Sequence, residues 1–323
     1  MILSCGESLI DLLVGKASGA GLASEAVPGG SPFNVAIGIA RLGGKAGFLS
    51  KISDDFFGRY LVRTLVKAGV NQRLLLSSPR QTTLSVAVTR PDGEAQYSFY
   101  GHESADRSLL PSELPATLPD DVSAIAIGSY TLAIDPTASA IEQLIEREHV
   151  RRVVSIDPNI RPTIIGDAKA WRPRFERLLA RCHIVKASTE DLAYLYGDGV
   201  DAGAWAAHWL TAGPQLVIIT RGDDGASVFF GSSTYNVPVR KVDVIDTVGA
   251  GDSFHAAVLV SLEEQNLLRP GAIRLASRDA LIRAIHFAIV ASSVTCSRQG
   301  ADLPTRADVE AVLLSTHPKA LQQ

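Results

Sequence analysis

Hydrophobic and polar positions follow two rhythms along this chain, and each rhythm predicts a different kind of structure. From about residue 120 onward, short apolar runs alternate with stretches in which apolar residues recur at helical spacing. Uninterrupted apolar strands of this length are typical of a mainly parallel sheet with helices on both faces. We expect strands at 123–128, 152–156, 183–186 and 215–220, and helices at 136–148, 168–181 and 188–196, followed by two final helices. The core is therefore predicted to be a doubly wound α/β layer.

Two segments depart from this rhythm. Residues 12–28 are polar and rich in glycine, whereas residues 83–100 alternate between apolar and polar positions around a Pro-Asp-Gly turn at 91–93. The second segment predicts a half-buried β-hairpin with Leu84, Val86 and Val88 on one face. We interpret about 12–28 and 83–102 as one small lid sheet. No repeat or Pro-rich linker divides the chain, so residues 1–323 are predicted to be a single domain with this lid inserted in it.

Composition excludes several classes of partner. With 31 basic and 34 acidic residues the net charge is -3, so no broad positive field attracts nucleic acid or an anionic membrane surface. The longest apolar stretches, 256–262 and 285–294, are too short or too interrupted to span a bilayer. The three cysteines have no metal-binding spacing, and the first residues do not resemble a secretory leader. We therefore expect a cytoplasmic protein without structural zinc.

The strongest candidate for chemistry is the segment 246–252, Asp-Thr-Val-Gly-Ala-Gly-Asp, which leads into an apolar helix through Leu262. Its small residues allow backbone N–H groups to converge at the helix start, where the helix dipole favours an anion such as a transferring phosphoryl group. Asp252, in the first turn, is positioned to accept a proton from an attacking hydroxyl. The same pattern is also typical of plain helix capping, so this segment alone leaves both interpretations open.

A second glycine-rich segment, 29–34, opens another helix. Ser31 is a candidate N-cap, and Pro32 suits the first turn. Asn34 then lies near the helix N-terminus, where its amide can both donate to and accept from a polyol, although a polar residue on a solvated face fits the pattern equally. Asp11, taken alone, is more typical of a strand end or turn than of a ligand contact.

Other enzyme classes lack their motifs in this chain. There is no G-x-x-x-x-G-K-[ST] segment of a P-loop kinase, and no G-x-G-x-x-G after the first strand, as a dinucleotide-binding oxidoreductase requires. The seven histidines fall in no nucleophile motif, which argues against a hydrolytic triad. These absences place the three classes behind other interpretations of the chain.

Together the glycine-rich segments resemble the two signatures of the ribokinase-like (PfkB) family of carbohydrate kinases, in order and over nearly the whole chain. The first is similar to Gly29-Gly30-x-x-x-Asn34, continuing to Lys51-Ile52-Ser53-Asp54-Asp55-x-x-Gly58, and the second to Asp246-Thr247-x-Gly249-Ala250-Gly251-Asp252. Within the family the chain looks most similar to fructokinases. The resemblance implies a Rossmann-like three-layer α/β/α fold with a β-sheet lid, and ATP-dependent phosphorylation of a sugar hydroxyl.

The resemblance also implies a role for each matching position. The catalytic positions are Asp252 as the base and Gly249, Ala250 and Gly251 as the anion hole. The sugar contacts are Asp11, Gly30, Asn34 and Arg161. The nucleotide contacts are Asn159, Lys186, Ser188, Thr220, Gly222 and Gly225. The metal positions are Asp191, which would orient hydrated Mg²⁺, and Asp246, which matches the family's monovalent-cation (K⁺) loop. The chain has Ser188 and Asp191 where the family often has Asn and Glu.

The substrate class follows from a missing charge. Many relatives place an arginine directly after the aromatic residue that ends the second lid strand, but this chain reads Phe99-Tyr100-Gly101. Losing that guanidinium removes a bidentate partner for a carboxylate, and nothing in the sequence places Arg107 to replace it. We therefore expect a neutral sugar, with fructose first, rather than a sugar acid such as 2-keto-3-deoxygluconate.

Other substrates and one other class of protein stay open at this point. Ribose is also a neutral sugar, and a nucleoside is compatible with Phe33, Phe99 and Tyr100 as stacking partners for a base. A catalytically silent sugar- or nucleotide-binding protein would be free to lose the proton acceptor and the anion-hole glycines, yet all are present. The lid leaves strand edges and an outer face to be covered, which favours a homodimer through the lid.

Overall fold

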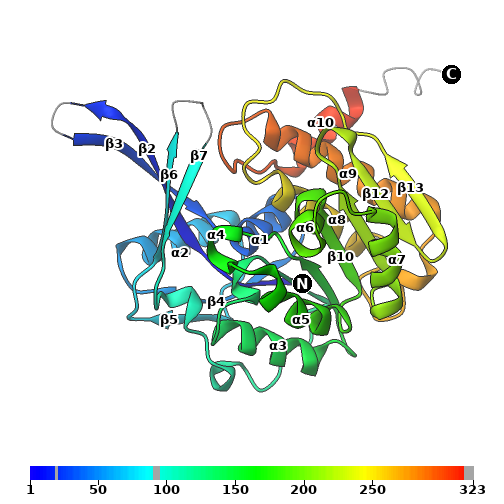
Figure 1. The fold of residues 1–323 in the computed structure, drawn as a ribbon, viewed down its shortest axis with the longest axis horizontal. Helices are drawn as coiled ribbons and strands as arrows, with labels where there is room; N and C mark the ends of the chain where they lie inside the picture. The colour runs from blue at the N-terminus through cyan, green and yellow to red at the C-terminus, as the bar shows by residue number, and fades with distance from the viewer. Residues whose placement is uncertain (19–20, 90–94, 316–323) are drawn as a thin grey trace.

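A nine-stranded sheet forms the centre of this computed structural model, which describes residues 1–18, 21–89 and 95–315 (Figure 1). Neighbouring strands run parallel except at β12, which is antiparallel to both its neighbours. The order of strands is β13 (Ser233–Val237), β12 (Ala226–Phe230), β11 (Leu216–Thr220), β10 (Ile184–Ser188), β9 (Val153–Asp157), β8 (Ala124–Gly128), β1 (Ile2–Cys5), β4 (Ala46–Ser53) and β5 (Leu75–Ser78). The first strand of the chain is therefore an inner strand of the sheet.

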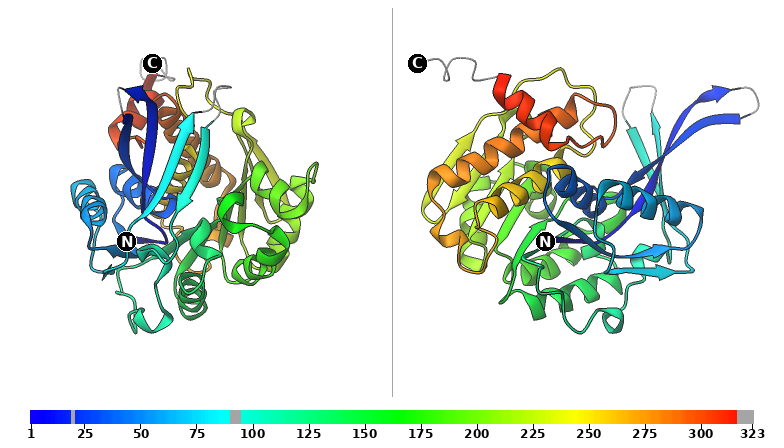
Figure 2. Two further views of the ribbon diagram at one scale, coloured as in Figure 1. Left: turned by 60° about the vertical axis from the view of Figure 1, so that its left-hand side comes forward. Right: turned by 180° about the vertical axis from the view of Figure 1, so that it is seen from behind.

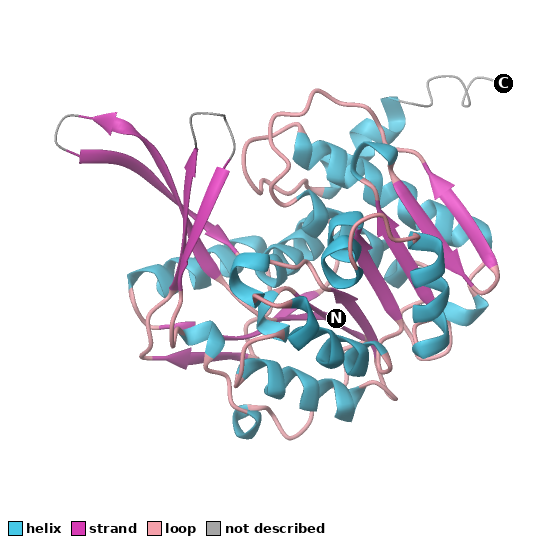
Figure 3. Ribbon diagram, in the orientation of Figure 1, coloured by secondary structure: helices cyan, strands magenta, loops and turns pink. Residues whose placement is uncertain are grey.

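Helices cover both faces of the sheet, because alternate strand residues point to opposite sides. Ile2 and Ala124 belong to one buried apolar cluster, while the adjacent Leu3 and Ile125 belong to the other. The first cluster is completed by α1 (Ser31–Arg41), α2 (Phe56–Ala68), α8 (Ala250–Glu264), α9 (Arg278–Cys296) and α10 (Arg306–Ser315). The second is completed by α3 (Thr137–Glu148), α5 (Ala168–Leu179), α6 (Thr189–Tyr196) and α7 (Ala202–Ala212). The predicted doubly wound α/β/α class is confirmed (Figure 3).

Local chemistry accounts for the boundaries of the helices. The Asp55 side chain caps α2 by accepting from Gly58 N at 2.7 Å, and Gly69 ends that helix in a left-handed conformation. One predicted boundary is wrong. Ser31 is the first helical residue of α1 rather than its N-cap, because Gly30 takes the cap position with a φ of 105° and leaves the serine hydroxyl unused by the helix.

The lid consists of two hairpins that stand away from the main sheet (Figure 2). β2 (Leu9–Ser18) pairs antiparallel with β3 (Gly21–Gly29), and β6 (Thr83–Thr89) pairs antiparallel with β7 (Ala95–Tyr100). The hairpins join where β2 and β6 run parallel, starting with Leu9 opposite Thr83. The predicted lid is confirmed, but it begins at Leu9 rather than near residue 12. The turn expected at 91–93 lies outside the described residues.

The polar face of the second hairpin is the one that points inward. Ser85 and Ala87 are buried, and Ser85 lines the cavity beneath the lid. Val88, on the apolar face, is 44% exposed. The predicted alternation is present, and its direction follows from what the lid covers, which is a polar cavity rather than the apolar core.

Buried polar side chains fix the root of the lid to the body. Thr83 Oγ1 and Tyr130 OH both donate to the carboxylate of Asp106, each at 2.6 Å. The Asp55 carboxylate accepts from Thr82 N at 2.8 Å, which ties the start of β6 to α2. The base of the lid therefore has a defined position above the sheet edge.

α9 is long and apolar enough to cross a membrane by length and composition, with a mean hydropathy of 1.4. However, 67% of that window is buried inside the molecule, where residues such as Ala288 and Ala291 are inaccessible. The helix packs beside α8 on one face of the main sheet. Its apolar character is that of a core helix.

Candidate active site

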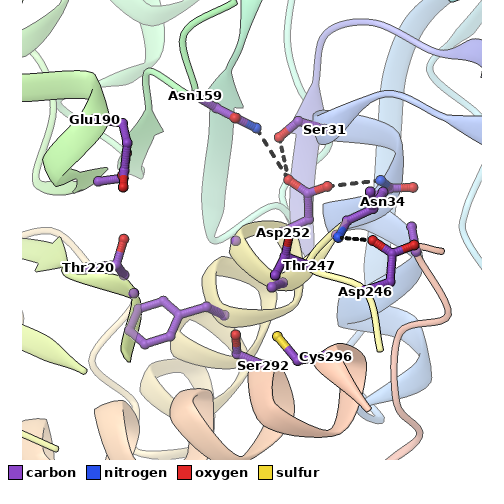
Figure 4. A pocket seen from close by; sticks show the side chains of 18 of the residues that line it. Ser31, Asn34, Asn159, Glu190, Thr220, Asp246, Thr247, Asp252, Ser292 and Cys296 are labelled. Carbon is purple, nitrogen blue, oxygen red and sulfur yellow. Dashed lines mark hydrogen bonds between the residues drawn. The ribbon is translucent and has the colours of Figure 1, made fainter. Parts of the chain in front are cut away.

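A cavity of about 1680 Å³ lies between the lid and the carboxyl ends of the parallel strands. Those strand ends meet at one edge of the sheet, which is where open α/β sheets bind ligands. Glu7 follows β1, Ser129 follows β8, Asn159 follows β9 and Gly222 follows β11, and all four line the cavity. Figure 4 shows Asn159 pointing toward Asp252 at the start of α8.

Every site residue expected from the sequence lines this one cavity. They are Asp11, Gly30, Asn34, Asn159, Arg161, Lys186, Ser188, Asp191, Thr220, Gly222, Gly225, Asp246, Gly249, Ala250, Gly251 and Asp252. The structure thus brings together segments that are far apart in the chain, while the role of each residue stays a prediction.

Asp252 is held by three polar side chains at the start of α8 (Figure 4). The residue is only 6% exposed. Ser31 Oγ donates to Asp252 Oδ1 at 2.6 Å, and Asn34 Nδ2 donates to Oδ2 at 2.9 Å. Asn159 Nδ2 lies farther from Oδ1, at 3.4 Å. The carboxylate is therefore oriented by the protein itself.

Burial raises the pKa of Asp252, because an ionised carboxylate is costly away from water. The hydrogen bonds from Ser31 and Asn34 oppose this rise, as does the charge of Arg161, whereas Asp157 adds to it. A carboxylate with a raised pKa accepts a proton more readily than an exposed aspartate does, which suits a general base.

The N-terminus of α8 has the glycine-rich geometry expected of the predicted anion cradle. Gly249 is the N-cap with a φ of 79°, a left-handed conformation that glycine adopts at little cost. A Cβ atom at Gly251 would lie 3.2 Å from Lys186 Nζ, so the ammonium group is beside the cradle. Lys186 pairs with buried Asp157 at 2.6 Å. Although burial acts to lower the pKa of Lys186, the carboxylates of Asp157 and Asp191 raise it overall, so the lysine is charged.

The end of the cavity under the lid carries two further carboxyl groups. Asp11 lines it from β2, and burial raises the pKa of Asp11. Glu7 is fully buried, and burial raises its pKa to about 7. The Glu7 carboxylate accepts from Thr131 Oγ1 at 2.9 Å and from Ser31 N at 3.3 Å. Arg161 lines the same region. This end offers many hydrogen-bonding groups in a confined space.

The opposite end of the cavity is more open. Thr220 ends β11, and Gly222 and Gly225 follow in the turn toward β12. The loop 239–248 lines the other side, and its Val244 is 58% exposed. Backbone and exposed apolar surface suit a flat heterocycle better than a polyol.

Three hydrogen bonds engage the Asp191 carboxylate. Its Oδ1 accepts from Ile160 N at 2.7 Å, and its Oδ2 accepts from Ser188 N at 2.8 Å and Ser188 Oγ at 3.0 Å. Within the described residues, no group of three or more His, Cys, Asp or Glu side chains surrounds a common point. The exposed Glu190 lines the cavity beside Asp191. These donors fit Mg²⁺ that arrives with phosphates and keeps several waters, because Mg²⁺ usually takes only one or two carboxylates.

Asp246 joins two loops at the edge of the cavity. Its Oδ1 accepts from Val248 N at 3.0 Å, and its Oδ2 accepts from Gly300 N at 2.9 Å. These bonds hold the loop before α8 against the segment after α9. A monovalent cation at Asp246 stays a prediction.

Sequence reasoning missed several residues that complete the site. They are Glu7, Ser85, Ser129, Tyr130, Glu190 and the loop 239–245. Glu7 and Ser129 come soon after strands β1 and β8, so attention to every predicted strand end would have found them. Tyr130 directly follows Ser129 and shares this signal, whereas Ser85 reaches the cavity only because of how the lid docks, and no local pattern marks it.

An anion cradle at a helix start, an oriented buried carboxylate and a lid over a cavity large enough for two ligands define a small-molecule kinase with the ribokinase-like fold. The family model described as pfkB family carbohydrate kinase matches residues 2–308. The chain belongs to this family and is an ATP-dependent carbohydrate kinase.

Individual relatives agree with this assignment. The chain is 40% identical over 281 residues to a fructokinase from Rhizobium leguminosarum bv. trifolii, covering 87% of this chain and 85% of the relative. A fructokinase from Xylella fastidiosa with bound ATP superposes with a TM-score of 0.90 at 26% identity and covers 98% of both chains. A double mutant of fructokinase from Vibrio cholerae O395, in a fructose-, ADP- and potassium-bound form, gives a TM-score of 0.82 at 27% identity, covering 96% of this chain and 97% of that one.

Proposed function

We propose that this kinase transfers the γ-phosphoryl group of ATP to a hydroxyl of fructose. The observation that carries the proposal is the chemistry under the lid, where hydroxyl, amide and carboxyl groups outnumber cationic ones. Such a surface recognises a neutral polyol through alternating donors and acceptors. The similarity to fructokinases, one of them at 40% identity, supports the same sugar.

The charges at this end of the cavity disfavour a sugar acid. Glu7, Asp11 and Asp252 line it together with Arg161. A substrate carboxylate would therefore meet three carboxyl groups and one guanidinium, and like charges at close range repel. A ketose hydroxyl is uncharged and would form hydrogen bonds with the same groups without this repulsion.

Arg107 does not replace the guanidinium that is missing at position 101, where this chain has glycine. Its guanidinium carbon lies 4.9 Å from the centre of the Tyr130 ring, and a Cβ atom at Gly101 would come within 3.0 Å of it. Tyr130 lines the cavity, whereas Arg107 is not among the lining residues. The guanidinium is thus stacked behind the aromatic ring, and this placement supports a neutral substrate.

The aromatic residues give little support to a nucleoside acceptor. Phe33 is fully buried, with its ring centre 5.9 Å from that of Phe48 in an edge-on arrangement. Tyr100 is 65% exposed and does not line the cavity. Phe99 is the one ring of the three that faces the ligand space. Of the three rings considered in the sequence, a nucleobase would therefore have only Phe99 as a stacking partner.

In the proposed reaction, the sugar hydroxyl lies between Asp252 and the cradle at residues 249–251. Asp252 accepts the hydroxyl proton as the new O–P bond forms and the bond to the ADP oxygen breaks. The N–H groups of the cradle and the Lys186 ammonium stabilise the charge on the phosphoryl oxygens. The lid excludes water from the sugar, which limits hydrolysis of ATP.

ATP would occupy the open end of the same cavity. Its proposed contacts are Asn159, Lys186, Ser188, Thr220, Gly222 and Gly225. Glu190 and Asp191, at the start of α6, line the cavity and would hold hydrated Mg²⁺, which would neutralise charge on the phosphates of ATP. A monovalent cation near Asp246 belongs to the same proposal, which the potassium-bound relative supports.

An ATP-coupled kinetic panel of fructose, ribose, 2-keto-3-deoxygluconate and adenosine, ranked by kcat/KM, tests the substrate. We expect fructose to rank first and the keto acid to rank below both neutral sugars. A clear preference for the keto acid would overturn the charge argument. A preference for adenosine would retain the mechanism and overturn the sugar, and no turnover with any acceptor would favour a protein that only binds.

We further propose that the protein is a cytoplasmic homodimer joined through the outer face of the lid. Val88 and Tyr100 are 44% and 65% exposed on this apolar face. A second copy of the chain packed there would remove this apolar surface from water. The three cysteines are unpaired, as is usual in a reducing compartment. Sedimentation should show a dimer that Val88→Lys converts to a monomer, and a wild-type monomer would refute the assembly.

A further inference from the structure

The hydroxyl of Ser31 performs a task that its position in the glycine-rich motif did not indicate. We propose that Ser31 is a positioning residue for the catalytic carboxylate, whose hydroxyl orients Asp252 and keeps it in the proton-accepting form. The proposal rests on the role of Asp252 as the general base, and it adds a residue whose side chain acts through that base rather than on the sugar.

The geometry of the contact is that of a strong, shielded hydrogen bond. Ser31 Oγ donates to Asp252 Oδ1 at 2.6 Å, and the two residues are 8% and 6% exposed (Figure 4). Bonds from a hydroxyl to an ionised carboxylate are shorter and stronger than neutral ones. Because Gly30 caps α1, no helix N–H competes for the Ser31 hydroxyl. The contact therefore links the start of α1 directly to the start of α8.

Two separate contacts fix the backbone that carries this hydroxyl. Glu7 accepts from Ser31 N at 3.3 Å, and Ser4 Oγ donates to Pro32 O at 2.7 Å. Both partners come from β1 or the turn that follows it. The position of the helix start is thus set independently of the bond to Asp252, so loss of the hydroxyl alone leaves this anchoring in place.

The distribution of donors identifies the oxygen that receives the proton. Oδ1 of Asp252 accepts from Ser31 and, at 3.4 Å, from Asn159, whereas Oδ2 accepts from Asn34 alone among the described residues. Oδ2 therefore retains an open lone pair for the sugar. The proton passes from the sugar hydroxyl to Oδ2, the oxygen's electron pair forms the bond to phosphorus, and the breaking P–O bond leaves its pair on ADP. The Ser31 proton stays on Ser31.

Several charged groups face Asp252, and Ser31 differs from all of them in being neutral. The charged groups are Asp11 on β2, Asp157 on β9, Arg161 after β9 and Lys186 on β10. A hydroxyl donor favours the ionised carboxylate without adding charge beside the phosphoryl group. Removing it leaves every charged neighbour unchanged, so protonation of Asp252 becomes easier and the loss of activity in acid begins at a higher pH.

The test compares Ser31→Ala with Ser31→Thr, which keeps a hydroxyl, and with Ser4→Ala, which removes the other serine hydroxyl that holds the start of α1. The pH dependence of kcat and the KM for sugar are measured with whichever acceptor has the highest kcat/KM. For Ser31→Ala we expect kcat to fall about 10-fold and the acid limb to rise by about one pH unit, with KM little changed. Ser31→Thr should retain most of kcat, and Ser4→Ala should leave the acid limb in place.

Three results would overturn the inference. An unshifted acid limb in Ser31→Ala would show that the hydroxyl does not support the ionised carboxylate. A rise in KM with unchanged kcat would make Ser31 a sugar contact, and an equal shift in Ser4→Ala would reduce its role to anchoring the helix. Asp252→Asn measured beside them separates the cases, because retained turnover there refutes the base itself rather than its support by Ser31.

Discussion

The two ends of the cavity differ in how completely the protein assembles them. Under the lid, Asp252 is buried and receives hydrogen bonds of 2.6 and 2.9 Å from Ser31 and Asn34. At the other end, Val244 is 58% exposed and Glu190 faces open space. The end to which we assign the chemistry thus has its hydrogen bonds in place without a ligand, whereas the end to which we assign the nucleotide is an open surface.

This difference follows from what each end has to do. A small displacement of a base costs rate directly, because the reacting atoms must be aligned within a fraction of an ångström to react. A nucleotide gains much of its affinity from its phosphates, for which we propose the cradle and Lys186 as partners, so the surface around its nucleobase can be less exactly shaped. Changes under the lid should therefore lower kcat, and changes at the open end should raise KM for ATP.

Asp252→Asn should have the largest effect. Replacing a general base typically lowers the rate by about 10²- to 10⁴-fold, and here the amide keeps the shape of the side chain. We expect kcat to fall in this range while calorimetry still detects sugar binding. The melting temperature serves as the control for folding. Near-normal turnover would show that Asp252 is not the base. It would also mean that substitutions at the buried end of the cavity lower kcat no more than substitutions at the open end do.

Lys186→Met should have the next largest effect, and it should act on two quantities. Loss of the ammonium beside Gly251 should lower kcat about 10²-fold, as loss of one oxyanion donor does. The Asp157 carboxylate would remain buried without its partner, which costs about 3–5 kcal/mol of stability.

The double variant Lys186→Met with Asp157→Asn is the matched control. It removes both charges, so most of the stability should return while kcat stays low. Chemical denaturation and steady-state kinetics report the two quantities separately. Recovery of kcat in the double variant would contradict a role for the lysine in charge stabilisation.

Val244→Ser should have the smallest effect, and it tests the open end of the cavity. The side chain is already exposed, so folding should be unaffected, and only its contact with a bound base is lost. We expect KM for ATP to rise a few-fold, corresponding to about 1 kcal/mol of apolar contact, with kcat unchanged. A fall in kcat without a change in KM would mean that this end is not a nucleotide surface.

The fold was largely predictable from the sequence because its strands are uniform apolar runs. The expected strand 215–220 is observed as β11, Leu216–Thr220, and the expected helix 136–148 as α3, Thr137–Glu148. The start of the lid was predicted less accurately. Leu9 is as apolar as a core residue, and only its pairing with Thr83 in a second sheet shows that the lid has already begun there.

The site was predictable where glycine and local motifs mark it, and not where side chains from distant segments meet. Gly249 and Asp252 lie in one short motif, so their proximity is encoded locally. Ser31 and Asp252 are brought together only by the packing of α1 against α8, and the same serine has the local pattern of a helix cap. Glu7 became significant only through its burial beside Ser31.

The inner position of β1 has a consequence for how the protein is made. β1 and the hairpin of β2 and β3 leave the ribosome before β8 (Ala124–Gly128), and β1 completes its pairing only when β8 has been synthesised. At common translation rates this interval is roughly 6–25 s. During that time β1 can pair with β4, but its other edge has no partner. Nascent chains that stop before residue 128 are therefore expected to depend on chaperones and to be early targets of proteolysis.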